Sequence, residues 1–289
     1  MKKRIITSEH INNFKLYLYE AERSENTIKK YIHDINTFID ITGENNIKKG
    51  ISKNDVLEYK RKLCRCYAPR SVNSMLSSVN AFFEFADWND LKVKTVKIQK
   101  QIFTPKDAQL TKKDYMQLID AALKANNMRM YYLMQTICST GIRISELKFI
   151  TAEAVKNGAA VINCKGKMRE VLLPPELCKM LLKYIKTQNI QSGAVFVTKT
   201  GAPVNRSNVW SEMKKICIAA NVKKEKVHPH SFRRLFARTY YEAEKDIVRL
   251  ADILGHSNVN TTRIYTMETS ENCMRQIQKL GLLHINHTT

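Results

Sequence analysis

The residues most able to do chemistry are two arginines, two histidines and one tyrosine that follow one another along the chain at characteristic spacings. Arg143 comes first, His230 and Arg233 lie three residues apart, and Tyr265 lies nine residues after His256. Guanidinium groups can hold two phosphate oxygens at once, and an imidazole can add a donor or move a proton. A phenol can attack phosphorus and leave again when the reaction reverses. The set therefore suits metal-free phosphoryl transfer that breaks and rejoins a phosphodiester.

Longer motifs surround these residues. TGIRISEL occupies 140–147, HPHSFRR occupies 228–234 and LGHSNVNTTRIYT occupies 254–266, with a basic turn, NCKGKMR, at 163–169. In order and spacing the chain strongly resembles the tyrosine recombinase family, the phage-integrase and Xer-like group. The resemblance covers nearly the whole chain and is sharpest over residues 140–267.

The resemblance implies a role for each residue. In that family the two arginines and the adjacent histidine bind the scissile phosphate, here Arg143, Arg233 and His230, and His256 belongs to the same catalytic set. The tyrosine, here Tyr265, attacks the phosphate and gives a 3′-phosphotyrosyl intermediate with a free 5′-hydroxyl. Strand exchange then passes through a Holliday junction. The resemblance implies no cofactor and no metal.

A lysine in the basic turn is the family's general acid for the leaving 5′-hydroxyl. Aligning the strand at 160–163 from its start places Lys165 at that position. The turn is about one residue shorter than is common, which leaves Lys167 as an alternative. A further departure is Arg234, where the family more often has histidine, and it adds positive charge near the site as a candidate DNA contact.

Each residue taken alone also has an ordinary structural explanation. Arg143 could be salt-bridged, His256 could interact with a helix dipole, and Tyr265 could be a half-buried tyrosine. Their common order and spacing favour the catalytic interpretation. His228 and His230 are two residues apart, but no cysteine or carboxylate follows at ligand spacing, so we expect no metal site.

Composition agrees with a nucleic-acid partner. The 289 residues contain 48 Lys and Arg against 27 Asp and Glu, a net charge of +21, with a pI near 9.7. Both the first hundred residues and the remainder are net basic, which favours a protein that holds double-stranded DNA from two sides.

The cysteines and the apolar runs bear on location. The seven cysteines include no CxxC pair and are expected to be reduced thiols. No secretion signal follows the first residues, and no apolar run approaches the roughly 18 residues that a membrane span needs. We expect a cytoplasmic, nucleoid-associated protein encoded by a bacterium, a phage or a mobile element, with no membrane association.

The expected fold is mainly α with a small antiparallel β-sheet. Residues 1–88 resemble the family's helical, SAM-like core-binding domain, and 89–107 form a basic interdomain linker or a short edge strand. Residues 108–289 form the mixed α+β catalytic domain. The length favours a two-domain enzyme without an added arm-binding domain.

Helical periodicity predicts four helices in the first domain, over 9–21, 28–39, 52–63 and 69–83. The motif Ser52 to Asp55 reads as a capping box. The basic residues around the third and fourth helices are candidate phosphate contacts; these are Lys60, Arg61, Lys62, Arg65 and Arg70.

In the second domain a capping box starts at Thr111, and alternation over 159–163 and 170–173 predicts a hairpin. A third strand is expected at 194–197. An amphipathic helix is expected over 268–283, and in the family such a segment packs on a neighbouring protomer. The resemblance implies four protomers on DNA, as a homotetramer or as a heterotetramer with a related recombinase.

Three functions compete. The first is a site-specific recombinase that acts in integration, excision or dimer resolution. The second is a DNA-relaxing enzyme of the type IB topoisomerase kind, and the third is a non-catalytic DNA-binding protein. The compact motifs around Arg143 and Tyr265 favour the recombinase.

Overall fold

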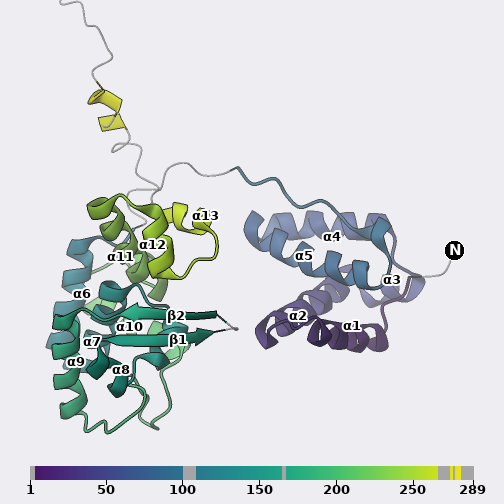
Figure 1. Cartoon of the computed structure of the whole chain (residues 1–289). Coiled ribbons are helices and arrows are strands. Elements are labelled where there is room, and N and C mark those ends of the chain that lie inside the picture. Colours follow the sequence, from purple (N-terminus) through teal and green to yellow (C-terminus); the bar gives the residue numbers. More distant parts are fainter. Residues whose placement is uncertain (1–3, 100–108, 165–166, 266–273, 276, 281–289) are drawn as a thin grey trace, which may run out of the picture. The chain divides into compact units, whose positions relative to one another are not determined.

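The computed structural model of the chain forms two compact units, Met1–Lys100 and Gln101–Thr289 (Figure 1). Each unit has an apolar core of its own. Within the described part of the chain, no helix is long and apolar enough to cross a membrane. The structure describes residues 4–99, 109–164, 167–265, 274–275 and 277–280.

All the regular secondary structure described in the N-terminal unit is helical, as predicted. Hydroxyl caps start three of the helices, because Thr7, Ser24 and Ser52 each accept a backbone N–H from the third residue of the turn that follows. Proline at position 69 lies in the first turn of the last long helix, where its missing N–H costs nothing. The elements are α1 (Ser8–Glu20), α2 (Glu25–Thr42), α3 (Glu44–Lys49), α4 (Lys53–Cys66), α5 (Pro69–Phe85) and η1 (Asn89–Leu91).

Aromatic side chains fill the core of this unit. Phe38 meets Tyr59 and Phe83 edge to face, with ring centroids 4.9 and 5.8 Å apart. The helix α3 was not predicted, because it is a short polar segment, in which Ile47 is the buried residue among those whose burial is described. The four longer helices confirm the periodicity of the sequence.

An extended segment follows η1 along the helices, and we call residues 92–97 the strap. Two asparagines of α5 hold its backbone: Asn80 donates to Val93 O at 2.8 Å and accepts from Val93 N at 3.0 Å. Asn73 pairs with Val96 in the same way, at 2.9 and 2.7 Å. The strap is therefore held by side chains in place of a neighbouring strand, and residues 92–99 contain no β-strand.

Two lysines of α4 complete the attachment of the strap. Lys53 Nζ donates to Asp90 O at 2.7 Å and to Lys92 O at 2.5 Å. One helical heptad further on, Lys60 Nζ donates to Lys94 O at 2.7 Å. The first half of the segment expected to be a linker thus packs on the helical unit.

The second unit is built around α7, whose buried side chains contact helices on several sides. It packs against α6, α9, α10 and α11. Its elements are α6 (Lys112–Lys124), α7 (Met128–Thr140), η3 (Ile144–Phe149), α8 (Ala152–Asn157), β1 (Ala159–Cys164), β2 (Lys167–Leu172), α9 (Pro175–Thr187), α10 (Arg206–Ala219), η4 (Lys224–Lys226), α11 (Pro229–Glu244), α12 (Ile247–Leu254), α13 (Val259–Thr262) and η5 (Arg263–Tyr265).

The predicted hairpin is confirmed as an antiparallel pair in which Ala159 faces Leu172 and Cys164 faces Lys167. The predicted third strand is wrong for the described residues. Segment 194–197 makes only isolated bridges, Thr151 with Ala194 and Val197 with Pro203. Its apolar residues are buried, but they pack as a loop under the helices.

The predicted C-terminal helix over 268–283 falls largely outside the described residues. Among those that are described, Met274 and Ile277 lie in helical turns, and both are exposed, as is Leu280.

The strap gives a stability prediction. We expect Asn80→Ala to destabilise the N-terminal unit by about 1–3 kcal/mol, because the amide and carbonyl of Val93 both lose their partner. Chemical denaturation and amide exchange of the full chain measure the effect. Ser77→Ala, at an exposed position on α5, is the control. Unchanged exchange at Val93 and Val96 in Asn80→Ala would contradict the attachment.

Candidate active site

The candidate site lies where α7 and α12 end, and each of these helices ends in a glycine turn. Gly141 ends α7 with φ +64°, and Gly255 ends α12 with the same value, a left-handed conformation that favours glycine. A Cβ at Gly141 would lie 2.5 Å from the Phe236 ring, and one at Gly255 would overlap the Arg169 side chain. Both turns therefore need glycine for conformation and for space.

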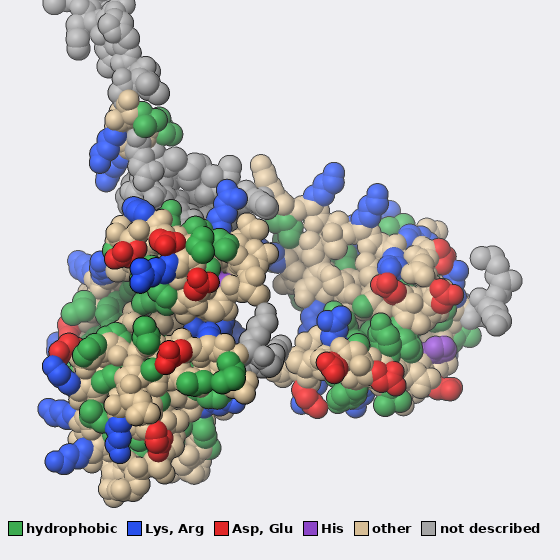
Figure 2. Space-filling view, in the orientation of Figure 1, with side chains coloured by type: hydrophobic (Ala, Val, Ile, Leu, Met, Phe, Trp, Pro, Cys, Tyr) green, Lys and Arg blue, Asp and Glu red, His purple; other side chains and the backbone are tan. Residues whose placement is uncertain are grey.

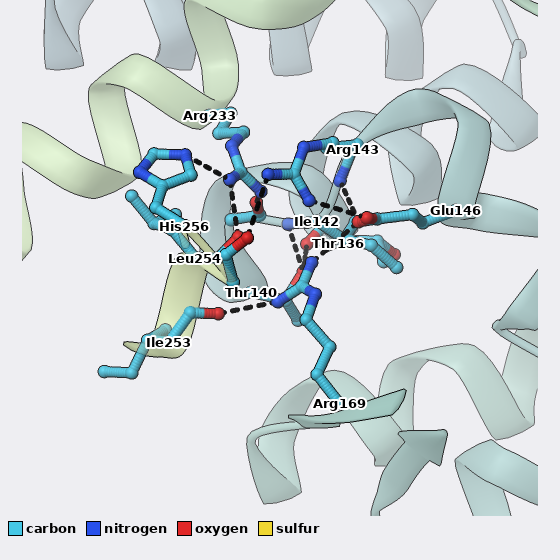
Figure 3. A network of polar contacts seen from close by, with 12 residues as sticks. Thr136, Thr140, Ile142, Arg143, Glu146, Arg169, Arg233, Ile253, Leu254 and His256 are labelled. Atoms are coloured by element: carbon cyan, nitrogen blue, oxygen red, sulfur yellow. Dashed lines mark hydrogen bonds and ion pairs between the residues drawn. The ribbon is translucent and has the colours of Figure 1, made fainter. Parts of the chain in front are cut away.

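Arg233 lies buried between these two helix ends. It is 1% exposed, and its guanidinium donates to Gly141 O and, at 2.7 Å, to Leu254 O (Figure 3). Partial negative charge at the C-termini of both helices stabilises the buried cation. Burial and the neighbouring Arg143 lower the pKa of Arg233 to about 10, so it remains charged at neutral pH.

His256 is held between Arg233 and a hydroxyl. Arg233 Nη2 lies 3.0 Å from its Nε2, and Thr262 Oγ1 lies 2.8 Å from its Nδ1. Because arginine can only donate, Nε2 accepts, which places the proton on Nδ1, facing Thr262. The contacts thus favour a neutral imidazole in one tautomer. Burial and the charge of Arg233 lower its pKa to about 4.

Tyr265 is the last residue of η5 and lies within the same cluster. Its side chain is 6% exposed, and its hydroxyl lies 3.3 Å from His230 Nε2. Its ring stacks beside His256, with centroids 5.9 Å apart. Figure 1 shows α11, α12 and α13 next to one another, and contacts among them and η5 hold the phenol at the site.

His230 reaches the phenol because α11 begins just before it. Pro229 occupies the first turn of α11, and His228 N–H donates to Ser231 Oγ at 3.3 Å. Partial burial, together with the charges of Arg234 and Arg233, lowers the pKa of His230. Arg234, which follows Arg233 on α11, is exposed.

Arg143 is the more accessible of the two arginines, with a side chain 37% exposed. Its Nη1 donates to Glu146 Oε1 at 2.8 Å, and its backbone N–H donates to Glu146 Oε2 at 2.9 Å. Its Nη2 makes a longer contact, 3.3 Å, to Gly255 O. The motif residues Arg143 and Gly255, far apart in sequence, are thus adjacent.

Glu146 is a buried carboxylate shared by two arginines. It is 4% exposed and pairs with Arg143 and with Arg169 Nη2, at 2.8 and 2.7 Å. Burial alone would raise the pKa of Glu146, but hydrogen bonds from Arg143 and the charge of Arg169 bring it below its usual value. The site therefore keeps an excess of positive charge around its single buried acid among the described residues.

The candidate general acids are not placed by the structure. Lys165 lies outside the described residues, and Lys167 is the first residue of β2, its side chain undescribed. Lys167 pairs with Cys164 at the end of the two strands.

The basic residues of α4 and α5 that are candidate DNA contacts differ in the hydrogen bonds, ion pairs and exposure of their side chains. Lys60 is bonded to the strap, Arg61 pairs with Glu58 at 3.2 Å, and Lys62 donates to Ile41 O at 3.2 Å. Arg65 and Arg70 are exposed. Figure 2 shows Lys and Arg side chains on the visible surface of both units. Nowhere in the described part of the chain do three or more His, Cys, Asp or Glu gather as metal ligands.

Sequence reasoning missed three supporting residues. Glu146 and Arg169 help to position Arg143, and Thr262 positions His256, but none of the three belongs to the catalytic set. The sequence did offer one signal for Arg169. It lies two residues before the apolar Val171, so both side chains lie on the inward face of β2. A charged residue at an inward strand position requires a buried partner.

Comparisons with known proteins agree with this geometry. The phage integrase family matches residues 108–272, and the N-terminal SAM-like domain of phage integrases matches residues 11–90. Tyrosine recombinase XerA of Pyrococcus furiosus is 27% identical over 295 residues that cover 98% of both chains. Tyrosine recombinase XerH of Campylobacter jejuni is 32% identical over 167 residues, 54% of this chain and 47% of its own.

Solved structures share the fold. A crystal structure of XerA recombinase, 23% identical, covers 97% of this chain and all of its own with a TM-score of 0.52. A lambda integrase dimer bound to a COC′ core site, 13% identical, covers 90% and 94% with a TM-score of 0.71.

Fold and site together define an enzyme that transfers phosphoryl groups in DNA through a tyrosine. The chain belongs to the phage integrase family, whose catalytic domain matches more than half of its length. It is a tyrosine recombinase, an enzyme that breaks and rejoins DNA.

The lowered histidine pKa values predict a pH response. Because His256 has a pKa of about 4 in the folded protein and about 6.5 when unfolded, protonation favours unfolding. This contribution to stability is complete above about pH 6.5 and is lost as the pH falls towards 4. His230 is the more exposed residue of the two, so solvent screens its partly buried ring and we expect the smaller pKa shift there.

NMR titration of the imidazole resonances in DNA-free protein measures these pKa values directly. His256→Gln assigns the resonance and should flatten the acid side of the stability profile. A titration midpoint for His256 near 6.5 would contradict the tautomer and charge assigned to it.

Proposed function

We propose that Tyr265 is the nucleophile of a site-specific DNA recombinase. Its hydroxyl attacks the scissile phosphorus, a 3′-phosphotyrosyl bond forms, and the bond to the 5′-oxygen breaks. The observation that carries this proposal is the position of the phenol, 3.3 Å from His230 Nε2 and stacked on His256 within an arginine cluster. The released 5′-hydroxyl later attacks the phosphotyrosine, so strands rejoin without an external energy source.

Arg143 and Arg233 are proposed to stabilise the charge that develops on the non-bridging oxygens. Arg233 is fixed by two helix ends, whereas Arg143 is partly exposed and can turn its fork to an incoming phosphate. His256, neutral and held by Thr262, accepts from Arg233 and so orients its guanidinium towards the same oxygens, and His230 accepts the phenol proton.

The leaving 5′-oxygen needs a proton, and we propose that Lys165 supplies it, with Lys167 as the alternative. Ammonium groups at a hairpin turn can reach a substrate that the rigid helices cannot touch. The reaction as proposed uses no metal and no cofactor.

We propose that the substrate is a pair of double-stranded recombination sites and that four protomers assemble on them, with a Holliday junction between two strand exchanges. Solved relatives include a lambda integrase tetramer bound to a Holliday junction and XerH bound to its difH substrate. The exposed apolar side chains Met274, Ile277 and Leu280 suit packing on a neighbouring protomer. Integration, excision and dimer resolution are all uses of this chemistry.

We also propose that residues 1–88 bind the duplex through α4 and α5, that 89–107 connect the units and that 108–289 carry out catalysis. Exposed Arg65 and Arg70 support this division. A cytoplasmic location, on the nucleoid, follows from the proposed substrate.

We expect Tyr265→Phe to abolish the covalent adduct and to retain DNA binding. Wild-type protein is incubated with a random-sequence duplex pool, and detergent-stable adducts are isolated and sequenced to define the site. A nicked duplex carrying that site then traps the adduct, because the short cleaved end diffuses away. If Tyr265→Phe still forms the adduct on this duplex, another residue is the nucleophile.

The two lysines are separated on the same nicked duplex. We expect Lys165→Ala to slow adduct formation by about 10²-fold or more, as loss of a general acid should, and Lys167→Ala to have a small effect. A 5′-bridging sulfur, which leaves without a proton, should restore the rate of the affected variant. The opposite pattern would assign the role to Lys167.

A further inference from the structure

Arg169 is a cation inside the site that the catalytic set does not include. It lies on β2 opposite Ile162, on the inward face of the hairpin, and its side chain is only 16% exposed. Figure 3 shows its guanidinium between Glu146 and the end of α12. A long charged side chain that is largely buried in this position is expected to stabilise or position the groups that it contacts.

The guanidinium groups of Arg169 and Arg143 each bind one oxygen of the Glu146 carboxylate. Arg143 Nη1 takes Oε1 at 2.8 Å, while Arg169 Nη2 takes Oε2 at 2.7 Å. A carboxylate beside one arginine tends to bind both prongs of its fork. Oε2 accepts from Arg169 and from the Arg143 backbone N–H, so the Arg143 guanidinium is held by one prong at Oε1. Its Nη2 keeps the 3.3 Å contact to Gly255 O.

The charges lead to the same conclusion. Arg143, Glu146 and Arg169 together carry one net positive charge, whereas Arg143 and Glu146 alone carry none. A neutral pair would offer little to the negative charge that grows on the phosphate in the transition state. Arg169 therefore preserves the charge of Arg143 for the substrate.

Arg169 also fixes the turn that carries His256. Its Nη1 donates to Ile253 O at 2.7 Å, and its side chain lies directly over Gly255, where a Cβ would overlap it. The same turn supplies the Gly255 carbonyl that Arg143 contacts. Arg169 thus sets the position of Arg143 from two directions.

We propose that Arg169 is a positioning residue that saturates Glu146 and thereby leaves Arg143 free to bind the scissile phosphate. This inference rests on the proposed role of Arg143. Arg169 itself does not touch the DNA. Its effect is confined to the step in which charge develops on the non-bridging oxygens.

The test compares substrates that differ in that charge. Adduct formation is measured on the nicked duplex with a normal scissile phosphate, with a methylphosphonate, which lacks the negative charge, and with a 5′-bridging sulfur. We expect Arg169→Met to be slower than wild type by about 10-fold to 10²-fold on the normal phosphate, somewhat less than loss of a direct donor. On the methylphosphonate we expect the deficit to shrink to within about threefold, because less charge needs stabilising.

Arg143→Ala is measured beside it and should show the same shrinkage. If its deficit does not shrink, the proposed phosphate role of Arg143 is wrong, and the inference is lost with it. If Arg143→Ala responds and Arg169→Met does not, only the inference is wrong. A deficit of Arg169→Met that shrinks only with the bridging sulfur overturns it as well, since Arg169 would then act on the leaving group.

A second-site variant separates charge from folding. If Arg169 works by saturating Glu146, then adding Glu146→Gln to Arg169→Met should recover part of the lost rate on the normal phosphate. A merely structural role predicts that the double variant is as slow as the single one or slower, an outcome that contradicts the proposal. Lys179→Met, which removes one charge from an exposed pair with Glu176, is the control and should match wild type. Thermal melting of each variant verifies that it is folded.

Discussion

The catalytic unit depends on how one buried cation is accommodated. Arg233 can remain charged while almost fully buried because the ends of α7 and α12 both direct carbonyl oxygens at it. Each of these ends turns away through a left-handed glycine, which exposes the carbonyls instead of covering them. The same turns place Arg143 and His256 next to Arg233. The carbonyl groups that stabilise the buried charge of Arg233 thus also bring together residues from distant parts of the chain.

The excess of positive charge in the site is balanced locally. Glu146 offsets part of the charge of Arg143 and Arg169, and the imidazoles of His230 and His256 stay neutral because cations surround them. In the absence of DNA the cluster therefore avoids the repulsion that four or five adjacent cations would create.

Much of this arrangement could be predicted from the sequence. The motifs gave the positions of Arg143, His230, Arg233, His256 and Tyr265, and the structure brings all five together. Periodicity gave the long helices and the hairpin, because these elements bury one regular apolar face. The lysines and the role of each residue remain matters for experiment.

What could not be predicted depends on contacts between distant segments. The segment at 194–197 has the apolar pattern of a strand but finds no neighbouring strand, so it packs as a loop. The strap lacks any periodic signal, since asparagine amides from α5 take the place of a strand partner. Arg169 and Glu146 have no local pattern that specifies their pairing across 23 positions.

The attachment of the strap also limits how far the chain can extend between its two cores. Val96 is bonded to α5, and Leu110 is buried in the second unit, so the 13 residues between them join these fixed points. A chain of that length reaches at most about 50 Å even when fully extended. In the proposed division of roles, in which both units bind one duplex, binding by either unit confines the other to a small surrounding volume. The second unit would then meet the same DNA at a high effective concentration, independent of how dilute the protein is.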